Sequence, residues 1–244
     1  MDVNNFDTTP SLIQTRTAHH SFAGEFESRT VKRTSEQIVE RAIAVRSRDG
    51  KNGVIHLQFF KNLSVVAILA AIYFAAGKLG LKLAFVHASA TAVWPPTGIT
   101  MAAFLLLGYR VWPGIFLGAF LVNMTTAGSV ATSIGIATGN TLEGLVGAYL
   151  VNRFAHGRNV FDRPLDIFKF TVFAGIVSTA VSATFGVTSL CLGSFANWAN
   201  YASIWLTWWL GDAMGDLVVA PLLILWIANP DGRGSRIRWS RGQI

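Results

Sequence analysis

The sequence predicts an all-α polytopic membrane protein, a transmembrane bundle of about six helices with both chain ends in the cytoplasm. Three observations lead to this fold class. Apolar residues make up 52% of the 244 residues and charged residues only 14%, whereas soluble domains carry about 25% charged residues. Long apolar stretches recur along the chain, and a helix needs about 20 such residues to cross a bilayer core. The basic residues gather in alternate segments between these stretches.

Six apolar stretches between residues 62 and 228 are expected to be the helices. They run over 62–80, 88–108, 110–127, 130–151, 165–190 and 202–228. The first stretch contains Lys78 near its end, and the ammonium group of this residue is expected to snorkel toward the interface. Only Gly108, Tyr109 and Arg110 separate the second stretch from the third, so we expect a tight turn there.

The basic residues predict the orientation of this bundle. Of the 20 Lys and Arg residues, all except Lys78 and Lys82 lie in segments that a six-helix path places on one side. The positive-inside rule makes that side cytoplasmic. A pI near 10 also suits proteins that neutralise nucleic-acid phosphates, but the distribution of charge favours membrane orientation. No nucleic-acid partner is therefore expected.

The chain divides into three predicted parts. Residues 1–61 are expected to form a charged, mostly disordered cytoplasmic tail, because they are too polar to build a core. A capping box from Thr34 to Gln37 predicts an amphipathic helix over 34–46 on an anionic inner leaflet; a solvated linker is the alternative. Residues 62–228 form the transmembrane domain and residues 229–244 a basic cytoplasmic tail. This chain is expected to lack an output domain of its own.

Three carboxylates lie inside the apolar stretches, Glu143 in the fourth and Asp212 and Asp216 in the sixth. An ionisable residue within a membrane segment is costly and commonly marks a functional site. Asn140 precedes Glu143 by three residues, and the two Asp residues are four apart, so each pair occupies one face of its helix. Trp208 extends the face of the Asp pair by one turn.

The two polar pairs are expected at matching depths if both helices run from outside to inside. At about 1.5 Å per residue, Asn140 and Asp212 lie about 15 Å below the outer surface, and Glu143 and Asp216 about 20 Å below it. We therefore predict one polar cluster, satisfied by hydrogen bonds, by protonation of the carboxyls, or by a cationic or hydroxylated ligand. The alternative is that these residues only join helices, at about 1 kcal/mol each.

The run Trp94-Pro95-Pro96-Thr97-Gly98 lies within the second apolar stretch. The prolines lack backbone donors, so a helix must begin or break here. Either the prolines start the helix with Trp94 in the aromatic belt, or a broken helix lines a cavity with its free backbone groups. The ligand-binding hypothesis comprises Asn140, Glu143, Asp212, Asp216, Trp208, Trp94 and Thr97. No catalytic residue, cofactor or metal site is predicted.

The small and hydroxylated residues of the apolar stretches are predicted to serve helix packing. Gly114 and Gly118, Gly135 and Gly139, and Gly211 and Gly215 have the GxxxG spacing that lets helices approach closely. The hydroxyls of the fifth stretch are expected to bond to their own helix unless they face Glu143; they belong to Ser178, Thr179, Ser182 and Thr184. The single Cys191 has no partner for an intramolecular disulfide, and the His residues show no metal-ligand spacing.

Several motifs in this order resemble the MASE1 family of integral membrane sensory domains. The resemblance covers about residues 60–228. The motifs are Ala92-Val93-Trp94-Pro95-Pro96-Thr97-Gly98-Ile99, the run from Leu105 to Ala119 with Trp112-Pro113-Gly114, Gly139-Asn140-Thr141-Leu142-Glu143, Trp205-Leu206-Thr207-Trp208-Trp209-Leu210-Gly211-Asp212-Ala213, and Ala220-Pro221-Leu222.

This resemblance implies a multi-pass input module of a bacterial inner membrane. Such modules usually precede a cytoplasmic histidine kinase, diguanylate cyclase or cyclic-di-GMP phosphodiesterase. The expected function is signal input without enzymatic activity. The expected partners are the lipid bilayer, an unidentified small ligand, a cytoplasmic output domain or partner protein, and a second copy of the chain in a homodimer.

Two other classes of function stay open. A small transporter or channel component would also use buried carboxylates and a proline-broken helix. A membrane anchor or assembly partner would need only the glycine faces. Substrate-dependent flux in vesicles would indicate transport, and tolerance of replaced carboxylates would indicate an anchor.

Overall fold

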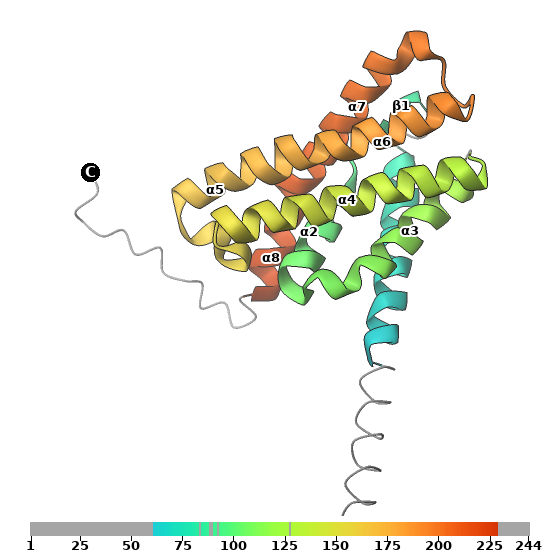
Figure 1. Ribbon diagram of the computed structural model, residues 1–244. Helices are drawn as coiled ribbons and strands as arrows, with labels where there is room; N and C mark the ends of the chain where they lie inside the picture. The colour runs from blue at the N-terminus through green and yellow to red at the C-terminus, as the bar shows by residue number, and fades with distance from the viewer. Residues whose placement is uncertain (1–60, 83, 88–89, 92, 127, 229–244) are drawn as a thin grey trace, which may run out of the picture. The chain divides into compact units, whose positions relative to one another are not determined.

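The computed structural model describes residues 61–82, 84–87, 90–91, 93–126 and 128–228 (Figure 1). The predictions for residues 1–60, including the helix over 34–46, and for residues 229–244 lie outside the described residues. Within the described ranges the structure is helical apart from one small antiparallel hairpin. In it, β1 (Ala84–His87) pairs with β2 (Ala90–Thr91).

The helical elements follow one another through short connections. The first described helix is Lys61–Leu81. After the hairpin come α2 (Pro95–Leu107), the 3-10 turn η1 (Tyr109–Val111), α3 (Trp112–Met124), α4 (Val130–Phe154) and the 3-10 turn η2 (Gly157–Asp162). The chain continues through α5 (Pro164–Phe170), the π-helix η3 (Thr171–Ser178), α6 (Thr179–Leu192), the 3-10 turn η4 (Trp198–Asn200), α7 (Tyr201–Met214), the π-helix η5 (Gly215–Val219) and α8 (Ala220–Ala228).

Three helices in the described residues are long and apolar enough to cross a membrane. They are Lys61–Leu81, Pro164–Leu192 and Trp198–Ile227, and they match the first, fifth and sixth predicted stretches. Large apolar side chains stand exposed along them, including Ile68, Phe168 and Leu222. Exposed apolar surface of this extent suits contact with lipid. The prediction of an all-helical membrane protein is therefore confirmed at this level.

The second and third predicted stretches form shorter helices than the sequence predicted. Both α2 and α3 have 13 residues, or about 20 Å, which is less than the roughly 30 Å of a bilayer core. The prediction of a helix over 88–108 is wrong for the first part of this stretch. There β2 pairs with β1, and the helix begins at Pro95 and Pro96. Prolines at these positions exclude a preceding helical turn. The fourth stretch, 130–151, corresponds to α4, which has 25 residues.

Helix α2 lies in the centre of the bundle and is buried along most of its length. It packs against α4, α7, η5 and α8, while α4 runs beside α6 and α3 (Figure 1). The predicted glycine packing is confirmed. A side chain at Gly118 would meet Tyr73 of the first helix, one at Gly139 would meet Phe185 of α6, and one at Gly215 would meet the Trp94 carbonyl.

Lys78 has protein partners at the end of α3. Its Nζ donates hydrogen bonds to the carbonyl oxygen of Thr125 at 2.9 Å and to Oγ1 of Thr126 at 3.0 Å. Cations favour helix C-termini, where carbonyl groups lack intrahelical donors. Lys78 therefore joins the first helix to α3, a role that the snorkelling prediction did not include.

Candidate ligand-binding site

Four elements bring the predicted polar residues together in the interior. Helix α4 carries Asn140 and Glu143, α7 carries Trp208 and Asp212, and η5 carries Asp216. The side chains are buried, with relative exposures of 1% for Glu143 and 0% for both Asp residues. We call these residues, with Thr97 of α2, the carboxylate cluster.

Local sequence explains why the elements meet here. Gly144 of α4 lies against Thr100 and Phe104 of α2, so the two helices approach closely beside Glu143. Pro221 has no N–H group to continue the α-helical bonding pattern. The preceding turn is the π-helix η5, in which the Ala220 N–H bonds to the Gly215 carbonyl. Segments of π-helix frequently occur at functional sites, and this one contains Asp216.

A chain of hydrogen bonds connects four helices beside the carboxylates. Nδ2 of Asn140 donates to the Tyr73 hydroxyl at 3.0 Å, and the Ser182 hydroxyl donates to Oδ1 of Asn140 at 2.7 Å. Nε1 of Trp208 donates to Oγ of Ser182 at 3.1 Å. Ser182 thus donates to α4 and accepts from α7 through one hydroxyl group. The chain therefore couples the first helix, α4, α6 and α7.

Asp212 meets the N-terminus of α2. The Thr97 hydroxyl, in the first turn of α2, donates to Oδ1 of Asp212 at 2.8 Å. A helix N-terminus carries partial positive charge and favours a nearby carboxylate. The first turn of α2 thus supplies both a hydroxyl donor and a favourable dipole to this residue.

The three carboxyl groups lie close enough to interact with one another. Glu143 interacts electrostatically with Asp212 and Asp216, and Asp216 interacts with Asp212. Among the described residues no Lys, Arg or His forms an ion pair with any of them. Within the same residues, Oε1 of Glu143, Oδ2 of Asp212 and both side-chain oxygens of Asp216 are buried without a hydrogen-bond donor. Such unpartnered acceptors are costly in a protein interior.

Trp94 lies at the edge of this cluster. Its backbone N–H donates to the Gly211 carbonyl at 2.8 Å, and the helix begins at the following residue. Pro95 and Pro96 therefore start a helix, as one of the two sequence interpretations predicted. Trp94 itself is buried rather than exposed in an aromatic belt, and its indole N–H has no hydrogen-bond acceptor within the described ranges.

Two members of the site were missed by the sequence analysis. Tyr73 is buried in the first helix and was not singled out, although a buried Tyr hydroxyl in an apolar helix usually has a partner. Ser182 was expected to bond to its own helix unless it faced Glu143; its hydroxyl instead donates to Asn140 of α4 and accepts from Trp208 of α7. Both residues connect the predicted ones.

The site offers acceptors for a ligand that carries positive charge or hydrogen-bond donors. The free carboxyl oxygens can accept, and the hydroxyls of Thr97 and Ser182 lie beside them. In the part of the chain that the structure describes, no group of three or more His, Cys, Asp or Glu residues is arranged to hold a metal ion.

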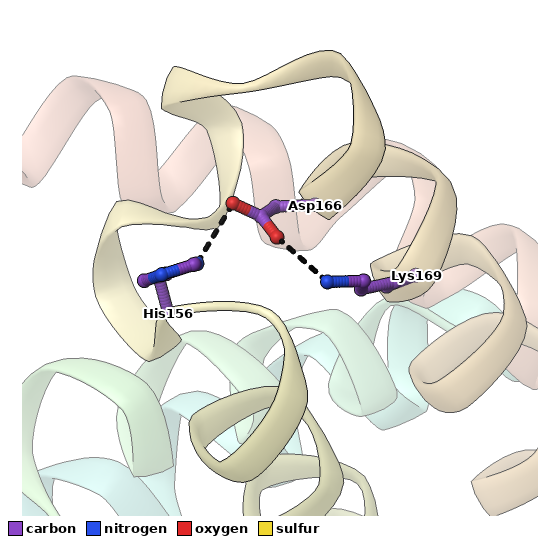
Figure 2. Close-up of polar contacts among 3 residues, drawn as sticks. All are labelled: His156, Asp166 and Lys169. Atoms are coloured by element: carbon purple, nitrogen blue, oxygen red, sulfur yellow. Dashed lines mark hydrogen bonds and ion pairs between the residues drawn. The ribbon is translucent and has the colours of Figure 1, made fainter.

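A second polar group lies outside the carboxylate cluster, at the turn from α4 to α5 (Figure 2). Nδ1 of His156 lies 2.8 Å from Oδ2 of the buried Asp166, and Nζ of Lys169 lies 3.4 Å from its Oδ1. His156 has a left-handed backbone with φ of 60°. These contacts fix the turn that joins the two helices, because Asp166 receives a partner from each side.

Comparisons with known proteins agree with the motifs in the sequence. The MASE1 family model matches residues 63–243. The chain is also 27% identical, over 137 residues, to a protein of Escherichia coli (strain K12) named probable diguanylate cyclase DgcE. That match covers 54% of this chain and 12% of the relative, so the chain spans only a small part of that protein's length. No solved structure is significantly similar to the chain. Because the family model covers most of the sequence, this chain belongs to the MASE1 family of membrane sensory domains.

Proposed function

We propose that this chain is a signal-input domain without enzymatic activity, and that its carboxylate cluster is the place where a stimulus acts. The observation that supports this most directly is the burial of Glu143, Asp212 and Asp216 together without a basic partner among the described residues. An arrangement that is costly for stability is commonly retained for function. Family membership supports a sensory role over a catalytic one.

The proposed ligand is a small cationic or hydroxylated molecule. Its donor groups would satisfy the carboxyl oxygens that have no described donor, at Glu143, Asp212 and Asp216. Hydrogen bonds that involve a charged group contribute about 1.5–3 kcal/mol each. Trp94 and Trp208 would form the aromatic border of the site, since both are buried beside it.

The proposed output is a small shift between helices. The cluster is shared by α4 on one side and by α7 and η5 on the other, so a ligand that binds one arrangement more tightly would shift the population toward it. Gly175 of η3 lies against Leu217 of η5, which brings the two π-helical segments into contact. Helix α8 follows η5 directly and would carry the shift toward the C-terminal end.

The proposed receiver is a cytoplasmic output domain or partner protein, such as a histidine kinase or a cyclase. The similar region of the E. coli relative belongs to a protein named as a diguanylate cyclase. The proposed orientation places both ends of the chain in the cytoplasm. Three contacts support the proposal that the basic segments lie at one end of the domain. Asn152 of α4 bonds to Tyr109 of η1. Asn62 and Arg110 line one groove, and α8 packs against η2.

A chimera tests this proposal. The full chain is fused to a diguanylate cyclase catalytic domain, and cyclic di-GMP is measured in cells at equal protein levels. We expect Glu143→Gln and Asp212→Asn each to change the output several-fold, because each replaces a member of the cluster without changing its size. Thr207→Val is the matched control, since this half-buried residue of α7 donates its hydroxyl to the Ser203 carbonyl and has no other hydrogen bond among the described residues.

Unchanged output from both carboxylate variants would mean that the cluster is only structural. Purified protein in vesicles addresses the transport alternative. Ligand binding without flux agrees with sensing, whereas saturable flux that depends on Asp212 would favour a transporter.

A further inference from the structure

A groove lies away from the carboxylate cluster, between the start of the first described helix and the turn from α2 to α3. Its cavity volume is about 80 Å³, and it opens to the surroundings. Its lining residues are Asn62, Val65, Val66, Leu107, Arg110 and Val111. Four of these are apolar, and one carries a permanent positive charge.

The groove lies where a membrane surface is expected. The helix Lys61–Leu81 is long enough to cross a bilayer, so Asn62 near its first residue belongs at one boundary. Tyr109 and Trp112, beside Arg110 in sequence, are 42% and 50% exposed. Exposed Tyr and Trp residues are typical of the headgroup level of a membrane.

Arg110 has no anionic partner in the protein as far as the structure describes it. The residue is exposed, and no ion pair or hydrogen bond of its guanidinium group occurs among the described residues. Asp166 already has His156 and Lys169 as partners, and the carboxylates of α4, α7 and η5 are buried in the cluster. A guanidinium group binds phosphate with paired hydrogen bonds.

We propose that this groove binds an anionic phospholipid. Arg110 binds the phosphate, and the acyl chain lies along Val65, Val66 and Leu107. A soluble phosphate would gain no binding free energy from the apolar lining. A phospholipid places its phosphate beside Arg110 and its acyl chain against the apolar residues. The bound lipid would join the first helix to the α2–α3 turn.

The test uses the full chain purified in a neutral detergent and titrated with dioctanoylphosphatidylglycerol. Dioctanoylphosphatidylcholine and inorganic phosphate are titrated in parallel, and binding is measured by calorimetry. We expect phosphatidylglycerol to bind more tightly than either of the others. Arg110→Gln should weaken its binding about tenfold, because a charge-assisted contact is lost, and Arg110→Lys should restore part of the affinity.

Two further variants separate a specific site from general attraction to a basic protein. Arg158→Gln removes the same charge from an exposed residue of η2 and should leave the affinity unchanged. Val66→Trp fills the groove without altering charge and should weaken binding as Arg110→Gln does. Equal losses in Arg110→Gln and Arg158→Gln, or equal affinities for inorganic phosphate and the lipid, would overturn the proposal. Circular dichroism of each variant checks that the helices are retained.

Discussion

At the scale of single residues, the interior of this membrane domain depends on side chains that connect different helices. Asn140 uses both ends of its amide, as a donor to Tyr73 and as an acceptor from Ser182. Ser182 in turn accepts from Trp208. Each hydroxyl or amide is therefore shared, and loss of one leaves a neighbour unpaired in a low-dielectric interior. The carboxylates lie beside this chain, because Glu143 follows Asn140 by one turn of α4 and Asp212 follows Trp208 by one turn of α7.

The first prediction concerns the Tyr73 hydroxyl. Tyr73→Phe removes the acceptor of Nδ2 of Asn140 while keeping the ring, so we expect destabilisation of about 1 kcal/mol. The measurement is the midpoint of thermal unfolding in detergent. Tyr149→Phe is the control, because Tyr149 is 59% exposed on α4 and should leave the midpoint unchanged. Equal midpoints for the two variants would show that the buried bond contributes no stability.

At the scale of elements, prolines and glycines decide where α2 lies. Pro95 and Pro96 start the helix, and Gly108, with φ of +83°, ends it. Gly98, in the first turn of α2, lies against the backbone of Gly215 and Ala220. This close approach brings Thr97 to Asp212, so the contact between backbones determines the geometry of the site.

The second prediction tests this close approach. Gly98→Ala places a methyl group against the Gly215 carbonyl and the Ala220 nitrogen, which are main-chain atoms and cannot rotate away. We expect a loss of about 1–3 kcal/mol in stability, measured as thermal unfolding in detergent. Gly175→Ala is the matched control, since its new methyl group would meet only the side chain of Leu217. A Gly98→Ala protein as stable as the control would mean that α2 and η5 lie farther apart.

At the scale of the whole molecule, the turns that carry basic residues support the proposal that these residues lie at one end of the domain. The turn η1 carries Arg110 and bonds through Tyr109 to Asn152 of α4. The turn η2, which carries Arg158, packs against α8. Exposed apolar residues surround the helices between these turns and the opposite end. The proposed orientation therefore depends on which side of the membrane the basic turns occupy.

The third prediction tests this orientation by labelling with a membrane-impermeant maleimide. The native Cys191, the only cysteine in the chain, is first replaced by Ser. A cysteine is then introduced by Ala199→Cys in η4 or by Asn159→Cys in η2, both at exposed residues. We expect labelling of intact cells only at residue 199, and labelling at both residues after permeabilisation. Labelling of intact cells at residue 159 alone would reverse the topology.

Much of the architecture could be predicted from composition and pattern. Apolar length located the first, fifth and sixth helices, because burial in lipid requires about 20 consecutive apolar residues. The extents of α2 and α3 could not be predicted this way. Their apolar residues are needed for contacts inside the bundle, so a short helix such as α2 has the same composition as a spanning one. The β1–β2 hairpin, whose second strand lies in the stretch 88–108, gave no separate signal.

For the candidate site, the sequence alone determined that Asn140 and Glu143 share one face of an apolar helix and that Asp212 and Asp216 share one face of another. Their motifs also determined membership of the MASE1 family. Only the tertiary structure decided that Thr97 donates to Asp212 and that Tyr73 and Ser182 join Asn140 in one chain. The spacing of residues in the sequence shows which of them share one helix face. Contacts between helices depend instead on glycines such as Gly98 and Gly144, which pack against backbone and side chains far away in the sequence.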